Sequence, residues 1–248
     1  MRKKSEMPGY TEITPSAEIE IQLHAGRAKC LQRLLSLDMP VPKTLGLAFD
    51  AVHSIAAGHL PDTAAMMAEF GEDPIVSVRP SSEDPDWGGP GAILNIGMND
   101  AHHAKIAKEV GKEAADALYL RFIQAYAIHV ARLDPDEFEV VDTNASDALE
   151  QVLQAYEDET DERFPQDPAQ QLSEVLRSMA RAWEGTTARI LRQAKGAPAD
   201  AGLGLEVQKM ALGVGAGESG SGVIQFISEI TGERTVKGRY LSQSQGRD

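Results

Sequence analysis

The first hundred residues alternate between spaced apolar positions that suit helices and short apolar runs that suit strands. Helical spacing begins after Ser16, a possible N-cap, and the prolines of residues 39–42 end it because proline cannot continue a helix. Residues 45–49 predict a short strand. Residues 75–79 are β-branched and bounded by prolines, which predicts a second strand, and residues 93–96 predict a third.

The second half of the chain is mostly helical and then turns to strands. Helical periodicity begins at residues 99–100 and continues past residue 120, and further helices are predicted at about 146–158 and 168–194. A linker of Gly, Ala and Pro follows. Strands are then predicted over residues 205–212, 223–227 and 235–241.

This order of elements predicts an α/β (α+β) fold in which both ends of the chain build one part. A loose N-terminal tail is expected over residues 1–15, and a helical subdomain is expected as an insertion. The predicted divisions are an α/β part, 16–100 plus 197–248, and the helical subdomain, 101–196. Nucleotides often bind in the crevice that such an arrangement makes.

Composition and charge limit the classes of partner. The 248 residues include 42% hydrophobic and 25% charged residues, which is ordinary globular usage. A net charge of −14 argues against binding of a nucleic-acid backbone. No apolar run is long enough to span a membrane or to act as a secretory signal, so we expect a cytoplasmic protein. The single cysteine, Cys30, excludes an intrachain disulfide.

Two glycine-bearing loops after strands are candidate phosphate sites. Glycine lets backbone N–H groups approach an anion closely, and an arginine such as Arg79 at a strand end can pair with phosphate. Neither loop has the Gly-Lys-Ser/Thr pattern of a phosphate loop. Composition favours a plain hairpin for residues 213–222 and leaves both interpretations open for residues 80–91.

Several segments, in order from residue 23 to residue 246, resemble the N-terminal domain of pyruvate phosphate dikinase and, more loosely, phosphoenolpyruvate synthase. The matching segments are LDMPVP at 37–42, SVR at 77–79, ILNIGMND at 93–100, RFIQ at 121–124, FPQDP at 164–168, VQKM at 207–210, SGSGV at 219–223 and TGE at 231–233. One such motif would be weak, but the ordered set covers nearly the whole chain.

The resemblance implies an ATP-grasp-like nucleotide-binding fold that binds ATP with Mg²⁺ and phosphorylates a histidine on a separate domain. Arg79 falls on the family's phosphate-contacting arginine, and Arg27 falls on its glycine-rich helix-start lysine. Gln208 and Met210 fall on the strand that borders adenine. The residues expected to bind the nucleotide are Arg27, Arg79, Gln208, Met210, Gly215 and Gly217.

Three departures from the family bear on function. The family's Gly-Gly-Lys-Gly reads Ala25-Gly26-Arg27-Ala28 here, and arginine differs from lysine in geometry. The first loop carries Glu83, Asp84 and Asp86, which could serve as Mg²⁺ ligands or as loop-capping acids. The sequence up to Asp248 is expected to lack the third nucleotide-binding subdomain and the histidine and pyruvate domains.

We therefore expect a pyruvate phosphate dikinase-like ATP-binding domain of kinase type that is incomplete for the full reaction, with a second protein chain as a possible source of the rest. The alternative is a non-catalytic regulatory or protein-binding module that keeps the fold. No catalytic residue is assigned, because none of the six histidines has the family's phosphohistidine context. No metal site is predicted from residue spacing.

Overall fold

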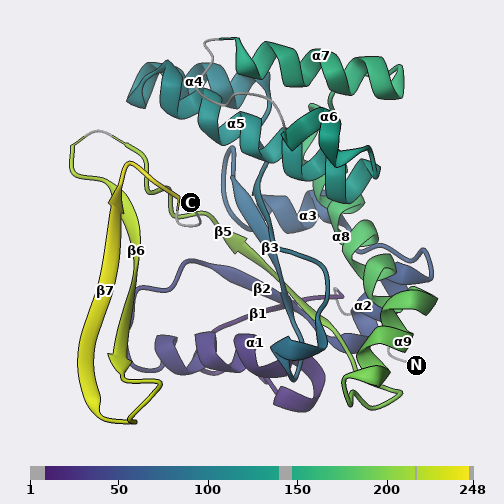
Figure 1. Cartoon of the computed structure of the whole chain (residues 1–248), viewed down its shortest axis with the longest axis vertical. Helices are drawn as coiled ribbons and strands as arrows, with labels where there is room; N and C mark the ends of the chain where they lie inside the picture. Colours follow the sequence, from purple (N-terminus) through teal and green to yellow (C-terminus); the bar gives the residue numbers. More distant parts are fainter. Residues whose placement is uncertain (1–8, 140–146, 216, 246–248) are drawn as a thin grey trace, which may run out of the picture.

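Helices and antiparallel strands make an α+β architecture (Figure 1). A computed structural model of the chain describes residues 9–139, 147–215 and 217–245. The strands are β1 (Thr11–Glu12), β2 (Thr44–Leu47), β3 (Val76–Ser81), β4 (Ile93–Ile96), β5 (Gly204–Lys209), β6 (Gly220–Ile227) and β7 (Arg234–Ser242). The α-helices are α1 (Ile21–Leu35), α2 (Phe49–Ala56), α3 (Thr63–Ala68), α4 (Asp100–Val110), α5 (Lys112–Tyr126), α6 (Pro135–Glu139), α7 (Ala148–Thr160), α8 (Pro168–Glu184) and α9 (Thr186–Ala194).

The main sheet contains strands from both sides of the helical region. Its order is β1-β2-β5-β3-β4, and every pair in it is antiparallel. The strand β5 lies between β2 and β3, although it follows them in sequence by more than a hundred residues. The sheet therefore cannot close until the chain has folded back from α9, whereas the division into two subdomains stays a prediction.

One face of the sheet is apolar and packs on helices. Alternate residues of a strand point to opposite faces, and one set on β2, β3 and β5 is buried. This set comprises Leu45, Leu47, Val76, Val78, Leu205 and Val207. The helix α8 supplies the opposing surface with Leu172, Val175, Leu176, Met179 and Trp183. This common core covers one face of the sheet, so only the opposite face is available for a functional site.

The helix α1 is interrupted at Ala25. This residue has φ 62° and ψ −176°, a conformation that is normally reserved for glycine, and its side chain is fully buried. The interruption starts a new helical turn at Gly26. The chain can come this close to β5 because a Cβ on Gly204 would lie 2.7 Å from the carbonyl oxygen of His24.

Two of the predicted long helices are broken by glycine. Gly111, at φ 102°, separates α4 from α5, and Gly185 adopts an extended conformation between α8 and α9. Side chains cap the starts of two helices: Asp62 accepts the N–H of Ala65 at 2.9 Å at the start of α3, and Asn99 opens α4, which confirms the helix start predicted at residues 99–100. Within the described ranges, no helix has the length and apolarity needed to cross a bilayer.

Two expectations for the N-terminal segment are wrong. The expected loose tail over residues 1–15 contains β1, which pairs with β2, and Ile13 is buried in a small apolar cluster under α1. Residues 1–8 lie outside the described residues. Ser16 does not cap α1, because that helix begins later, with Glu20 at the N-cap position.

The strands β6 and β7 form a separate two-stranded hairpin (yellow in Figure 1). The expectation of a plain hairpin across residues 213–222 is wrong, because β5 belongs to the main sheet and β6 pairs with β7. The hairpin turn lies further on, where Ser228 N–H donates to the carbonyl oxygen of Glu233. Large apolar side chains of this hairpin are exposed: Val223, Ile224, Phe226, Ile227, Ile230, Val236, Tyr240 and Leu241.

The backbone conformation of Ala25 generates a stability prediction. Ala25→Gly and Ala28→Gly each delete one buried methyl group from α1, but only Ala25 has a conformation that favours glycine. We expect Ala25→Gly to leave the protein about 1–3 kcal/mol more stable than Ala28→Gly, because it releases strain of that order. Urea unfolding of both variants measures the difference, and equal losses of stability would show that Ala25 is unstrained.

Candidate functional site

The second face of the main sheet is polar. On β5, Glu206 and Gln208 alternate with the core residues and therefore point to the face away from the core. Strand register places Arg79 opposite Glu206, and Ser77 opposite Gln208 on β3. On the other side of β5, Thr44 of β2 lies opposite Gln208. Hydrogen-bonding side chains thus cross all three central strands in one row, and in the adjacent row Arg79 lies beside Glu206, opposite Gly46 of β2.

Glu206 is the charged centre of this face. Its side chain is 1% exposed, and the Nε atom of Arg27 lies 3.8 Å from its Oε2 atom. Burial raises the pKa of Glu206 to about 8, and this is opposed by Arg27, the backbone N–H of Ala28, Arg79 and the hydroxyl of Ser81. Near neutral pH the carboxyl group is therefore largely protonated, so the two arginines retain most of their positive charge.

A cavity of about 460 Å³ opens beside this cluster. The restarted turn of α1 lines it with Gly26 and Arg27, and residues 80–83 and 88–90 line it from the loop after β3. The N–H of Arg27 donates to Ser81 Oγ at 3.1 Å, and its Nε donates to the carbonyl oxygen of Pro80 at 3.2 Å. The positive end of a helix dipole beside a half-exposed guanidinium is suited to an anion.

Four of the six predicted site residues lie on the polar face of the sheet or on α1, which covers that face. Arg27 and Arg79 flank Glu206, and Gln208 lies two residues further along β5, where its Nε2 donates to Thr44 Oγ1 at 2.9 Å. Met210 continues the same alternation, and its N–H donates to the carbonyl oxygen of Ile75, which extends the β3–β5 pairing.

The predicted glycines Gly215 and Gly217 do not line the Arg27 cavity. They lie in the connection between β5 and β6, where the side chain of Gln243 binds their backbone. Its Nε2 donates to the carbonyl oxygens of Gly215 and Gly217 at 3.1 and 3.0 Å, and its Oε1 accepts the N–H of Gly215 at 3.1 Å. This loop is therefore held in shape by Gln243, and its role in binding a ligand stays a prediction.

The acidic loop after β3 contains one of the loop-capping acids that the sequence left open, while a role as Mg²⁺ ligand stays a prediction. Asp84 acts as a loop cap, because its Oδ1 accepts the N–H of Asp86 at 2.8 Å. Glu83 is exposed and lines the cavity. In the part of the chain that the structure describes, no three His, Cys, Asp or Glu side chains are grouped closely enough to hold a metal ion by themselves.

Sequence reasoning missed Glu206, the buried partner of both arginines. Its signal was the alternation of residues 205–208, Leu-Glu-Val-Gln, which puts Glu206 and Gln208 on the same face. A glutamate in a strand usually faces solvent, so its burial became visible only when α1 was placed over β5.

Comparisons with known proteins place the chain in a family. No protein-family model matches it. It is 32% identical over 198 residues to pyruvate, phosphate dikinase of Clostridium symbiosum, which covers 71% of this chain and 22% of that protein. It is 28% identical over 282 residues to the Rhizobium meliloti enzyme, covering 97% of this chain and 31% of the relative. The chloroplastic pyruvate, phosphate dikinase 1 of Arabidopsis thaliana is 24% identical over 261 residues, or 91% of this chain and 27% of that protein.

The matches confirm the resemblance inferred from the sequence motifs. The chain is a divergent member of the pyruvate, phosphate dikinase family, and it spans less than a third of the length of these relatives. The fold shown by the structure is α+β, while its assignment as ATP-grasp-like and the activity of the site remain proposals.

The raised pKa of Glu206 predicts a pH dependence of stability. In the folded state the carboxyl group binds a proton more tightly than in the unfolded chain. Its contribution to the free energy of unfolding is therefore fully present below about pH 4.5 and is lost as pH rises toward about 8. Glu206→Gln removes this titration. We expect the free energy of unfolding of the variant to exceed that of the parent increasingly over this range, by up to about 1.4 kcal/mol per pH unit.

Urea unfolding at several pH values measures the effect. Glu109→Gln, at an exposed glutamate of α4, is the matched control and should follow the parent at every pH. A constant difference between Glu206→Gln and the parent from pH 5 to pH 9 would mean that Glu206 ionises normally in the folded protein.

Proposed function

We propose that this chain binds ATP together with Mg²⁺ through an ATP-grasp-like fold and forms the nucleotide-binding part of a pyruvate phosphate dikinase-like phosphotransferase. The observation that carries the proposal is the convergence of Arg27 and Arg79 on a buried Glu206, beside a cavity at a helix start. Family membership supports it, because the relatives are named as dikinases.

The charge balance of the site favours phosphate. With Glu206 largely protonated, Arg27 and Arg79 present nearly two positive charges at the polar face of an otherwise acidic protein. Guanidinium groups bind phosphate oxygens in pairs, and the helix start adds the positive end of its dipole. The γ- and β-phosphates of the nucleotide would therefore lie near Arg27, and the base near Gln208 and Met210.

Magnesium would arrive with the nucleotide. Mg²⁺ usually keeps several waters and is held by substrate phosphates plus one or two carboxylates, so it needs no group of three protein ligands. Glu83 is the exposed carboxylate that lines the cavity and could supply such a ligand. Mg²⁺ would neutralise phosphate charge next to this acidic loop.

The phosphoryl acceptor and the chemistry of pyruvate are not assigned to these 248 residues. A second chain that supplies them stays a prediction. The alternative of a non-catalytic protein-binding module has one observation in its favour, the exposed apolar side chains of the β6–β7 hairpin. The nucleotide proposal is preferred because it accounts for the paired arginines and the buried glutamate, which a protein contact at the hairpin leaves unexplained.

Calorimetric titration with Mg·ATP tests the proposal. We expect saturable binding to the parent protein and at least about tenfold weaker binding to Arg27→Gln, because one charge-assisted contact contributes about 1.5–3 kcal/mol. Arg27 is half-exposed, so its replacement should leave the fold intact.

Arg33→Gln is the matched control, since Arg33 is an exposed arginine in the last turn of the same helix. It should bind Mg·ATP as the parent does. Absence of binding to the parent at millimolar nucleotide, or equal binding to Arg27→Gln, would refute the assignment of the cavity and leave the protein-binding alternative as the next hypothesis.

A further inference from the structure

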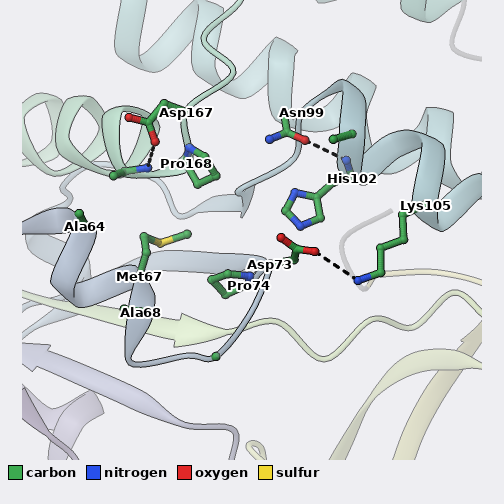
Figure 2. A pocket seen from close by; sticks show the side chains of 13 residues that line it. Ala64, Met67, Ala68, Asp73, Pro74, Asn99, His102, Lys105, Asp167 and Pro168 are labelled. Atoms are coloured by element: carbon green, nitrogen blue, oxygen red, sulfur yellow. Dashed lines mark hydrogen bonds and ion pairs between the residues drawn. The ribbon is translucent and has the colours of Figure 1, made fainter.

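A second cavity lies between α3 and the starts of α4 and α8, away from the Arg27 site (Figure 2). Its volume is about 370 Å³, within the range of small-molecule sites. Met67 and the neighbouring alanines of α3 form one wall, and Pro74 and Pro168 add further apolar surface. None of its lining residues belongs to the proposed nucleotide site.

His102 borders this cavity with unsatisfied hydrogen-bonding capacity. The residue is 7% exposed, and Figure 2 shows its ring directed from α4 toward Asp73 and Met67. Neither Nδ1 nor Nε2 has a hydrogen-bond partner among the described residues. A buried polar group without a partner costs about 1–3 kcal/mol, so its retention on a core-facing position of α4 points to a ligand.

The other polar groups around the cavity are already engaged. Asp73 forms an ion pair with Lys105 at 3.4 Å, and Asp167 caps its own helix by accepting the N–H of Ala169 at 3.0 Å. Asn99 accepts the N–H of His102 at 2.8 Å and so caps α4. A bound cation would need a carboxylate that is free of such contacts, and neither aspartate of the lining is.

The starts of α4 and α8 adjoin one another at the cavity. Gln166 joins them, because its Oε1 accepts the N–H of Asp100 and its carbonyl oxygen accepts from Asn99 Nδ2. The positive ends of two helix dipoles therefore face the same space, to which His102 adds a ring N–H donor, and Lys105 lies at its border in the ion pair with Asp73. Two nearby aspartates disfavour a dianion, so a singly charged anion suits the site best.

We propose that this cavity binds a small monocarboxylate with an apolar body. Its carboxylate accepts from the His102 ring and lies near Lys105 and the two helix starts, while its hydrocarbon part packs on Met67 and Pro74. The site is separate from the proposed nucleotide site and does not depend on it.

Isovalerate is a suitable probe, and the His102 ring resonance in NMR spectra, assigned with the His102→Phe variant, is the readout. We expect saturable movement of this resonance with half-saturation at about 1 mM. The variant lacks that resonance, so its binding is followed by backbone amide shifts around α4. We expect His102→Phe to bind isovalerate at least about tenfold more weakly than the parent protein. Lys105→Gln should bind about threefold more weakly, whereas Lys108→Gln, at an exposed lysine of the same helix, should bind as the parent does.

Two further probes separate the ligand classes. Isovaleramide has the same shape without the charge, and inorganic phosphate has the charge without the apolar body, so both should bind much more weakly than isovalerate. Equal binding of the amide, preferential binding of phosphate, unchanged binding by His102→Phe, or no saturable shift at tens of millimolar isovalerate would each overturn the proposal. Arg27→Gln should bind isovalerate normally, which keeps this result distinct from the nucleotide titration.

Discussion

The polar half of the structure depends on the buried carboxyl group of Glu206. It lies on the central strand of the main sheet, with Arg79 beside it on β3 and Arg27 above it on α1. A carboxyl group at this depth is tolerated only if it is neutral or has cations nearby, and here both conditions are partly met. The backbone N–H groups of Arg27 and Ala28 bond to Ser81 and Glu206 and hold the restarted turn of α1 against the sheet, so Glu206 contributes to both the geometry of the cavity and the charge of its wall.

Local structure was largely predictable from the sequence, but the pairing of distant segments was not. The helix start at Asn99 and the β-branched run of β3 are short-range signals, and the structure confirms them. Periodicity cannot say that β5 inserts between β2 and β3, because that pairing joins residues more than a hundred positions apart. The strained Ala25 was missed for the same reason, because its conformation accompanies the close approach of α1 to β5.

The sequence motifs shared with the family predicted some residues of the candidate site but not others. The motifs supplied Arg27, Arg79 and Gln208, and the structure places them around one polar surface. They did not supply Glu206, whose importance follows from burial, or His102, which the sequence presents as one of two adjacent helix histidines. His103 is satisfied, since its Nε2 lies 2.6 Å from Asp116 Oδ1, while His102 has no such partner among the described residues.

Arg27 and Glu206 are best understood together. The glycine-rich pattern that this segment resembles has lysine at the position of Arg27, and a lysine ammonium would have to serve the carboxyl group, the loop and the proposed phosphate through one nitrogen atom. Arginine separates these tasks: its Nε donates to the carbonyl oxygen of Pro80 and faces Glu206, and its terminal nitrogens carry four further N–H donors. The backbone of Ala25 is strained at a position where the resembled pattern has glycine, and the helix start nevertheless stays in place. A degenerating site would be expected to relax such strain and to lose the contact between a buried carboxyl group and an arginine, whereas this chain maintains both.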